Sequence, residues 1–265
     1  MPDVTALAAR SGEAIDTLER IAAGHWRGGE TDALGDWVLR AGSGFTGRAN
    51  SALAIGDPGM PLDVALATVT DWYRARDLPP MVAVPLPLSP GSSLDDLLAE
   101  RRWPARPGPA YVMTAAVAGP VSPLPLQEGT RLQMDAEPDD AWLDMYHYRG
   151  TGTLPPVARQ ILTSAPWQAF ASIRDTAGRP AAIARLSVSG GWAGITAVEV
   201  ATDQRRRGLG TLITQAVRAE AARQGASQVF LQVETSNSGA RALYERCGFG
   251  YSHWYQYRVA PLSDR

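Results

Sequence analysis

The sequence predicts an α/β fold in which a central mixed β-sheet is flanked by helices. Segments with the apolar periodicity of strands and of helices alternate along the chain, and two helix-like segments each lie between two strand-like ones. Of the 265 residues, 45% are hydrophobic and 20% are charged, which is ordinary for a compact globular protein. A chain of this length can form one large domain or two domains of about 130 residues each.

The first half of the chain contains four predicted elements. They are a helix over 61–76, a strand over 81–86, a helix over 92–102 and a strand over 110–117.

A proline-rich stretch separates the two halves. Pro120, Pro123 and Pro125 lie close together, and proline both removes a backbone donor and biases the preceding residue away from helix. We therefore predict an N-terminal domain over 1–119, an extended linker over 120–129 and a second domain over 130–265.

The second half alternates strands and helices more clearly. The predicted elements are, in order, a strand over 130–135, helices over 139–149 and 155–164, strands over 167–174, 180–189 and 192–201, a helix over 208–224, a strand over 228–234, a helix over 238–247 and a strand over 251–259. Turn residues at 175–178 and the glycine pair at 190–191 join the three central strands into a meander. Gly225 and Gly248 each close a helix.

Composition excludes several kinds of chemistry. The formal net charge is −2, so no basic field is available for a nucleic-acid backbone or an anionic membrane. The 25 basic residues are all arginine, which excludes a Schiff-base lysine. One cysteine and three histidines offer no spaced zinc cluster and no intrachain disulfide, so we expect no bound metal.

Targeting signals are not evident in the printed sequence. Charged residues interrupt the first twenty positions, and no apolar run reaches the 18 residues that a membrane span needs. We expect a soluble, cytoplasmic protein that is a monomer or a homodimer.

The segment over 198–210 carries the clearest chemical signal. It follows a predicted strand and opens a helix, where unpaired backbone N–H groups and the helix dipole favour an anion. Gly208 and Gly210 allow close approach, and Arg205, Arg206 and Arg207 add positive charge. This arrangement suits a diphosphate. Its alternative is an exposed arginine-rich turn.

Two motifs together resemble those of the GNAT acyltransferases. Arg205-Arg-Arg-Gly208-Leu-Gly210 is similar to the Arg/Gln-x-x-Gly-x-Gly/Ala signature of that family. One helix and one strand later, Asn237-Ser-Gly-Ala-Arg-Ala-Leu-Tyr244-Glu-Arg-Cys-Gly-Phe249 resembles its second motif almost position for position. The resemblance extends from Thr130 onward and implies the GNAT fold and an acetyl-CoA co-substrate.

The resemblance also implies which residues bind the co-substrate. In the family two central strands splay apart, the first of them pairs with the pantetheine arm, and the amides of the following loop hold the pyrophosphate. The matching residues here are Val198, Glu199, Val200, Arg205, Arg206, Arg207, Gly208, Leu209, Gly210, Thr211, Asn237 and Tyr244. Asn237 also suits a helix N-cap, and the two roles are compatible.

Tyr244 matches the general acid of the family. When an amine attacks a thioester directly, the leaving thiolate must be protonated, and a phenol held against it is a reasonable donor. The alternative is a tyrosine packed at the end of a core helix.

The general base is less clearly marked. Glu199 and Glu234 lie on or beside the strands that we expect to splay, and either carboxylate could take a proton from an ammonium group. Members that acetylate ribosomal-protein N-termini have a glutamate where this sequence has Gln232, which cannot act as a base. Glu199 is therefore our candidate, with a solvated strand end as the alternative.

A further set of residues fits either a structural role or a role at the acceptor site. Aromatic residues and histidines gather on two predicted elements: Trp142, Tyr146, His147, Tyr148, His253, Trp254 and Tyr255. They fit the wall of an acceptor site or ordinary packing. Cys247 is expected to pack at a helix end. The glycine-rich stretch over 42–50 fits either a hairpin at the acceptor site or a turn.

We therefore expect an N-acetyltransferase that transfers an acetyl group to a primary amine of a small molecule in a ternary complex. The first half repeats the order of the last four elements, and 98–101 echoes 243–246, with Ala99 where the second half has Tyr244. This resembles tandem GNAT proteins with one degenerate copy, which would shape the acceptor pocket. The alternatives are an acetyltransferase acting on protein N-terminal or side-chain amines, and a non-catalytic CoA-binding sensor.

Overall fold

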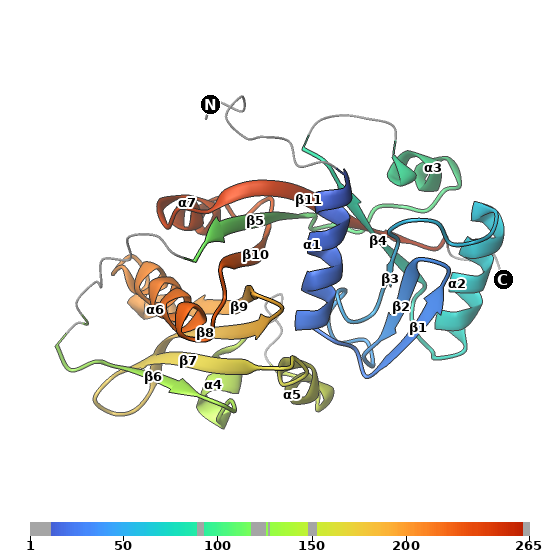
Figure 1. The fold of residues 1–265 in the computed structure, drawn as a ribbon. Coiled ribbons are helices and arrows are strands. Elements are labelled where there is room, and N and C mark those ends of the chain that lie inside the picture. The colour runs from blue at the N-terminus through green and yellow to red at the C-terminus, as the bar shows by residue number, and fades with distance from the viewer. Residues whose placement is uncertain (1–11, 89–92, 118–125, 127, 148–152, 262–265) are drawn as a thin grey trace. The chain divides into compact units, whose positions relative to one another are not determined.

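The computed structural model describes residues 12–88, 93–117, 126, 128–147 and 153–261 (Figure 1). The chain divides into two compact units that are not continuous in sequence. The first unit comprises residues 1–112, 233–236 and 251–265, and the second comprises 113–232 and 237–250.

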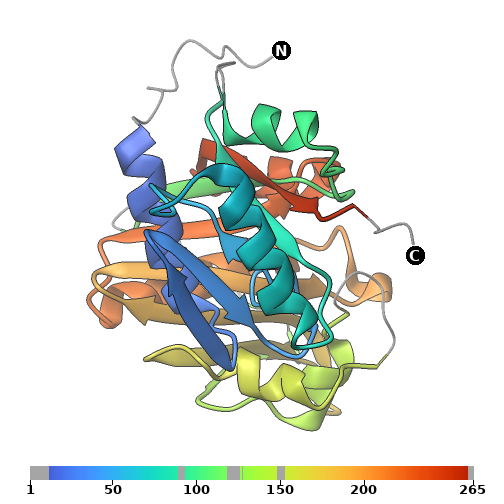
Figure 2. The ribbon, with the colours of Figure 1, turned by 90° about the vertical axis from the view of Figure 1, so that its right-hand side faces the viewer.

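The first unit contains a meander of strands with three main helices. Its elements are α1 (Gly12–His25), β1 (Glu30–Leu34), β2 (Trp37–Ala41), β3 (Ala52–Leu53), α2 (Leu62–Arg74), β4 (Met81–Leu86), α3 (Leu94–Glu100) and β11 (Gly250–Val259), which joins it from Tyr251 onward. Its strands are hydrogen-bonded in the order β1-β2-β3-β4-β11. Figure 2 shows α1 and α2, in blue and teal, as the two longer helices of this unit.

Helix α2 is amphipathic and contributes its apolar face to the core of the first unit. Its residues Ala65, Leu66, Val69 and Tyr73 recur at helical spacing and are buried against the strands. Strand β11 is attached on the other side of β4, and Arg258 of β11 donates to both carboxylate oxygens of Asp95 in α3, at 2.7 and 2.6 Å.

The second unit carries the segments with the chemical motifs. Its elements are β6 (Arg131–Asp135), α4 (Asp140–Met145), α5 (Val157–Leu162), β7 (Gln168–Arg174), β8 (Pro180–Ser189), β9 (Trp192–Val200), a short 3₁₀ turn η3 (Thr202–Gln204), α6 (Leu209–Arg223) and α7 (Ser238–Arg246). Two further strands, β5 (Ala110–Ala116) and β10 (Gln228–Glu234), cross the limits between the units. The strand order is β5-β10-β9-β8-β7-β6.

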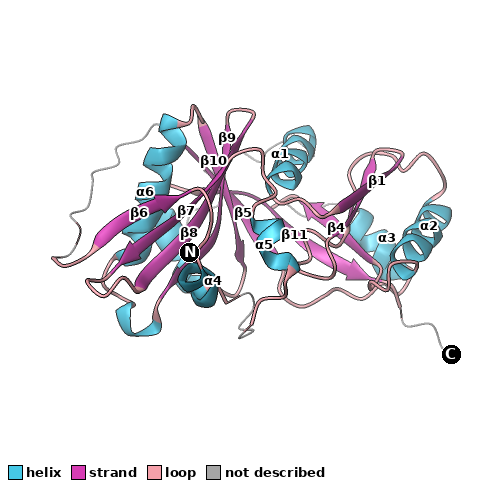
Figure 3. Ribbon diagram, turned by 90° about the horizontal axis from the view of Figure 1, so that it is seen from below, coloured by secondary structure: helices cyan, strands magenta, loops and turns pink. Residues whose placement is uncertain are grey.

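Helices cover both faces of the strands of the second unit. Helix α6 packs on β7, β8 and β9, and α4 packs on β8 from the opposite face (Figures 1 and 3). Strands β7 and β8 are accordingly buried along nearly their whole length. The apolar stripe predicted for the long helix is present, since Leu209, Leu212, Ile213, Val217 and Ala221 are all buried. The fold is a mixed α/β fold, as the sequence predicts.

The two units share one order of elements. In the first, β1, β2 and β3 form an antiparallel meander, α2 follows, and β4 pairs with β3 in parallel. In the second, β6 to β9 form an antiparallel meander, α6 follows, and β10 pairs with β9 in parallel. This repeated topology supports an internal duplication of the chain.

Most predicted elements are found within one to three residues of their expected bounds. The helix expected over 139–149 is shorter, because α4 ends at Met145 and residues 148–149 lie outside the described part. The sequence reading did not identify α1, β1, β2 or β3. Most of the proline-rich stretch lies outside the described residues, so the limits at 119 and 130 stay a prediction. The compact units have other limits, because β11 pairs with β4.

Among the described residues, none of the helices has the length and apolar character that crossing a membrane would require.

Candidate active site

A β-bulge bends β9 next to the proposed donor motif. Ile183 of β8 pairs with Glu199, whereas Arg185, two residues on, pairs with Thr196, so β9 has one extra residue in between. Ala197 has a φ of +52°, a left-handed value that residues with a Cβ rarely adopt. Such bulges bend a strand and redirect the residues beyond them. The residues redirected here are Val198, Glu199 and Val200.

The parallel pairing of β9 with β10 ends where the bulge begins. It runs from Trp192 opposite Gln228 to Ile195 opposite Leu231 and includes no later pair. The other edge of β9 still pairs with β8 as far as Val200. The backbone of 198–200 therefore has one edge that β10 does not occupy, which agrees with the splayed strands expected from the family resemblance.

The loop after β9 contains two residues with a left-handed backbone conformation. Arg206 has a φ of +60° and the N-cap Gly208 a φ of +79°. The 15-residue helix α6 begins directly after this loop, and the N–H groups of its first turn, which have no helical partners, favour an anion. Arg205 anchors this loop by donating from Nε to the carbonyl oxygen of Val200 at 3.3 Å.

Gly210 keeps α6 close to α7. A Cβ atom at this position would lie 2.6 Å from Cδ1 of Leu243 and 3.7 Å from Cγ2 of Val200. Glycine therefore suits the two positions of the motif for different reasons. At Gly208 it permits the left-handed backbone conformation, and at Gly210 it permits close packing of the two helices.

A cavity of about 740 Å³ lies between the end of β9, the start of α6 and α7. It is lined by eleven of the twelve predicted co-substrate residues: Val198, Glu199, Val200, Arg205, Arg206, Gly208, Leu209, Gly210, Thr211, Asn237 and Tyr244. The sequence reading missed four others on α7, Gly239, Ala240, Leu243 and Arg246. They lie three or four residues from one another or from Asn237, a spacing that places them on one helix face.

Arg207 is the predicted co-substrate residue that does not line this cavity. It lines a second cavity of about 380 Å³, and its guanidinium donates to Oε1 of Gln204. Of the three consecutive arginines, Arg205 and Arg206 therefore line the first cavity and Arg207 lines the second.

Asn237 is the N-cap of α7. Its Oδ1 accepts a hydrogen bond from the backbone N–H of Ala240 at 3.1 Å, so the capping role is present. Because Asn237 also lines the cavity, a second interaction with a ligand is compatible with this role.

Tyr244 lies deep in α7 and is only 7% exposed. Its ring packs edge-on against Phe249, with 5.9 Å between the ring centroids. Burial, together with the nearby Cys247, raises the pKa of Tyr244 above its ordinary value. The phenol is therefore a neutral proton donor at any physiological pH.

Glu199 meets His147 at the wall of the cavity. Oε1 of Glu199 accepts the backbone N–H of His147 at 2.8 Å, and Oε2 lies 3.4 Å from ring Nδ1. Burial raises the pKa of Glu199, and the contacts with His147 and the charge of Arg205 oppose this effect without cancelling it. Glu234, the other candidate base, is exposed, belongs to the first unit and does not line the cavity.

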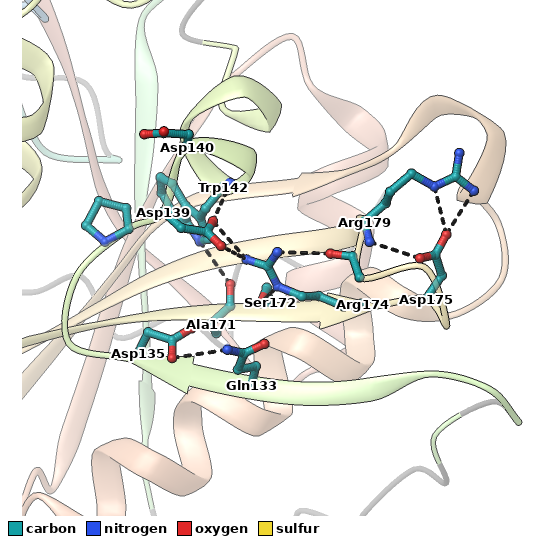
Figure 4. A network of polar contacts seen from close by, with 12 residues as sticks. Gln133, Asp135, Asp139, Asp140, Trp142, Ala171, Ser172, Arg174, Asp175 and Arg179 are labelled. Atoms are coloured by element: carbon teal, nitrogen blue, oxygen red, sulfur yellow. Dashed lines mark hydrogen bonds and ion pairs between the residues drawn. The ribbon is translucent and has the colours of Figure 1, made fainter.

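A polar network fixes the helix that precedes His147 (Figure 4). Asp139 caps α4 by accepting the N–H of Trp142 at 2.8 Å and binds Arg174 of β7 through both oxygens at 2.9 Å. Arg174 is buried and also donates to Ser172 and to the carbonyl of Gly178. Burial alone would raise the pKa of Asp139, but these hydrogen bonds outweigh it and lower that pKa.

The remaining candidates that the structure describes have packing or hydrogen-bonding roles away from the cavity. Trp142 and Tyr146 are buried against each other, and Tyr148 lies outside the described residues. His253 belongs to the first unit and is fully buried, with Nε2 2.8 Å from Glu19 of α1. Tyr255 is buried in the same unit, and Trp254 donates to the carbonyl of Pro87.

Cys247 is buried at the end of α7, and burial raises the pKa of its thiol, which agrees with the predicted packing role.

The glycine-rich stretch over 42–50 is a largely buried loop that Asn50 holds together. The side chain of Asn50 accepts from the N–H groups of Gly42 and Gly44 and donates to the carbonyls of Phe45 and Thr46.

Comparison with known proteins agrees with these motifs. Residues 13–258 match the family model described as "Probable histone acetyltransferase Rv0428c C-terminal". The chain is 31% identical over 254 residues to "Probable histone acetyltransferase Rv0428c" of Mycobacterium tuberculosis, covering 93% of this chain and 74% of that protein. It is 28% identical over 249 residues to "Uncharacterized N-acetyltransferase YobR" of Bacillus subtilis, covering 92% of this chain and 98% of that protein.

Solved structures resemble the fold over nearly the whole chain. A GCN5-related N-acetyltransferase from Kribbella flavida matches with a TM-score of 0.71 at 18% identity, over 97% of this chain and 98% of its own. A tandem GNAT protein from the clavulanic acid biosynthesis pathway matches with a TM-score of 0.65 at 14% identity, over 97% of this chain and 91% of its own. The chain therefore belongs to the family of the Rv0428c C-terminal region and is a GNAT N-acetyltransferase.

Proposed function

We propose that the chain transfers the acetyl group of acetyl-CoA to a primary amine of a small molecule, by direct attack within a ternary complex. The observation that carries this proposal is the 740 Å³ cavity, because one wall combines an anion-binding loop, an open strand edge, a buried phenol and a carboxylate. The first two can bind the co-substrate, and the other two can act as acid and base in acetyl transfer from a thioester.

The donor side would use backbone more than side chains. The N–H groups over 206–211 and the charges of Arg205 and Arg206 would hold the pyrophosphate. The unoccupied edge of Val198–Val200 would pair with the amides of the pantetheine arm, as an added strand does. Asn237 would contact the same arm while it caps α7.

Tyr244 would protonate the leaving thiolate. Because the phenol is buried and neutral, it can donate its proton as the carbon–sulfur bond breaks, and the thiol of CoA leaves protonated. The phenolate regains a proton, directly or through water, from the nitrogen that has attacked the thioester, which leaves the amide product neutral. Glu199 would remove a proton from the acceptor ammonium, directly or through water, before the amine attacks. Its raised pKa makes it a stronger base than an exposed carboxylate.

A protein amine is the second candidate acceptor. The relative from Mycobacterium tuberculosis is named a probable histone acetyltransferase, and the side-chain amine of lysine would undergo the same chemistry. A non-catalytic CoA sensor is less well supported, because Tyr244 and Glu199 both line the cavity.

The proposal is tested by measuring release of the CoA thiol from acetyl-CoA with benzylamine, putrescine, glucosamine and a lysine-containing histone-tail peptide. We expect a small amine to accelerate release most. Faster release with the peptide than with any small amine would favour the second candidate. Acetyl-CoA binding without acceleration by any amine would favour the sensor.

A further inference from the structure

His147 connects the proposed base to solvent. Its backbone N–H and ring Nδ1 approach the two carboxylate oxygens of Glu199, at 2.8 and 3.4 Å. The side chain of Glu199 is 25% exposed, whereas that of His147 is 49% exposed. The imidazole therefore lies between the mostly buried carboxylate of Glu199 and the solvent.

The surroundings of Glu199 contain two basic groups. His147 approaches from the segment after α4, and Arg205 contributes positive charge from the loop after β9. The residue that pairs with Glu199 on the neighbouring strand is apolar Ile183. Among the described groups that act on Glu199, the imidazole is the one whose two ring nitrogens can both accept and donate a proton.

The position of His147 is fixed by the end of α4. Asp139 caps the start of this helix, and the indole of Trp142 donates to the carbonyl of Ala171 in β7 at 3.0 Å (Figure 4). Tyr146 follows the last helical residue with an extended ψ of 104°, which ends the helix. The next N–H, that of His147, is consequently available for Glu199 and not for a helical carbonyl.

We propose that His147 is a positioning and proton-relay residue for acetyl transfer, acting through Glu199. This inference rests on the proposed function. The carboxylate of Glu199 takes one proton from the acceptor ammonium and becomes a carboxylic acid. The acid passes this proton from Oε2 to Nδ1 of the neutral imidazole, and the imidazolium then releases its Nε2 proton to water. The carboxylate is regenerated, proton exchange with water returns the ring to its Nε2–H tautomer, and the neutral amine attacks the thioester.

Substitutions can separate the ring from the backbone contact. Any residue except proline at position 147 keeps the N–H that donates to Oε1 of Glu199. Asparagine additionally places an amide nitrogen near the position of Nδ1, so His147→Asn retains a hydrogen-bond donor but cannot carry a proton. His147→Ala removes both functions of the ring.

The kinetic test compares two nucleophiles with wild type, His147→Asn and His147→Ala. The first is the panel alkylamine with the highest rate, which is protonated at pH 7 and needs a base. The second is hydroxylamine, which is largely unprotonated at that pH. We expect both substitutions to lower kcat/KM for the alkylamine about tenfold or more, with the rate for hydroxylamine and the KM for acetyl-CoA unchanged. Added imidazole should partly restore the His147→Ala rate.

Two kinetic results would overturn the relay. A wild-type rate in His147→Asn would show that the ring only donates a hydrogen bond, and an equal loss with hydroxylamine would show that it acts only through the structure. A wild-type protein that is active with no amine would instead contradict the proposed function itself.

A second measurement does not require the acceptor. The carboxyl of Glu199 is titrated by NMR in wild type and in His147→Ala. Because His147 opposes the rise that burial causes, its removal should raise the pKa of Glu199 further. An unchanged midpoint would mean that the two groups are not coupled and would overturn the inference.

Discussion

At the scale of single residues, the structure of α7 explains why the second motif has these residues at these positions. Asn237 caps the helix, Leu243 packs near Gly210, and Tyr244 lines the cavity. The sequence could indicate these positions because their spacing places them on related faces of one helix. It could not pair Glu199 with His147, because 52 residues separate them and their contact depends on where α4 ends.

Tyr244→Phe should lower kcat by a factor of about 10² to 10⁴, since the leaving thiolate would lose its proton donor. The Kd for acetyl-CoA should change little, because only the hydroxyl is removed. Stopped-flow measurement of CoA release and a binding titration check both expectations. Because burial raises the pKa of Tyr244, the wild-type rate should also not fall through loss of this proton as the pH approaches 10. Unchanged turnover in Tyr244→Phe would exclude the phenol as the acid.

Glu199→Gln should remove the acidic limb of the pH profile. The base is active only as a carboxylate, and its pKa is raised, so the wild-type rate should increase as the pH rises through a value above the ordinary range for glutamate. Glutamine cannot titrate, so the variant should be slower and lack this limb in a plot of kcat/KM against pH. The same limb in both proteins would assign it to another group.

At the scale of elements, the junction between β9 and α6 forms the donor site through its backbone. The bulge at Ala197, the end of pairing at Ile195 and the left-handed Gly208 all act within fifteen residues of chain. The glycine pattern indicated the loop, because only certain backbone conformations favour glycine. The bulge was not predictable in this way, since alanine usually avoids a positive φ and gives no sign of one.

Gly208→Ala should weaken acetyl-CoA binding, because alanine resists the φ of +79° that the loop adopts where it lines the cavity. Nothing lies within 4 Å of the added Cβ, so the direct cost is backbone strain of about 1 kcal/mol. Gly225→Ala is a matched control at the other end of α6, with a φ of +78° and equally open space. Both variants should lose similar stability in thermal unfolding, but only Gly208→Ala should raise the Kd. Equal Kd values would contradict a role for the loop amides.

At the scale of the whole molecule, the two compact units exchange segments of the chain. Strand β11 follows the catalytic motifs in sequence but pairs with β4, while β5 is placed beside β10. Proline content and periodicity could suggest a boundary near 120, because they are local properties. They could not show that β11 pairs with β4, because strand pairing is decided by contacts between distant segments. The long helix and its neighbours were easier to predict, since their apolar stripe lies within one element.

A fragment comprising residues 130–265 should therefore not unfold cooperatively. It would lack β4, the partner of β11, and β5, the neighbour of β10, and would expose strand edges that are paired in the full chain. Calorimetry of the fragment beside the full chain checks this, with a broad or absent transition expected. A sharp transition would support the limits suggested by the proline-rich stretch.

The central claim is that acetyl-CoA binds in the cavity formed by β9, α6 and α7. Hydrogen–deuterium exchange of the full chain with and without acetyl-CoA tests this claim directly, because the proposed donor contacts include the backbone amides over 206–211 and the strand edge over 198–200. The structure predicts protection over 198–211 and 237–246, with little change in α2 and the loop before it. Protection at α2 without protection at 198–211 would contradict the claim and would place the donor site in the first unit.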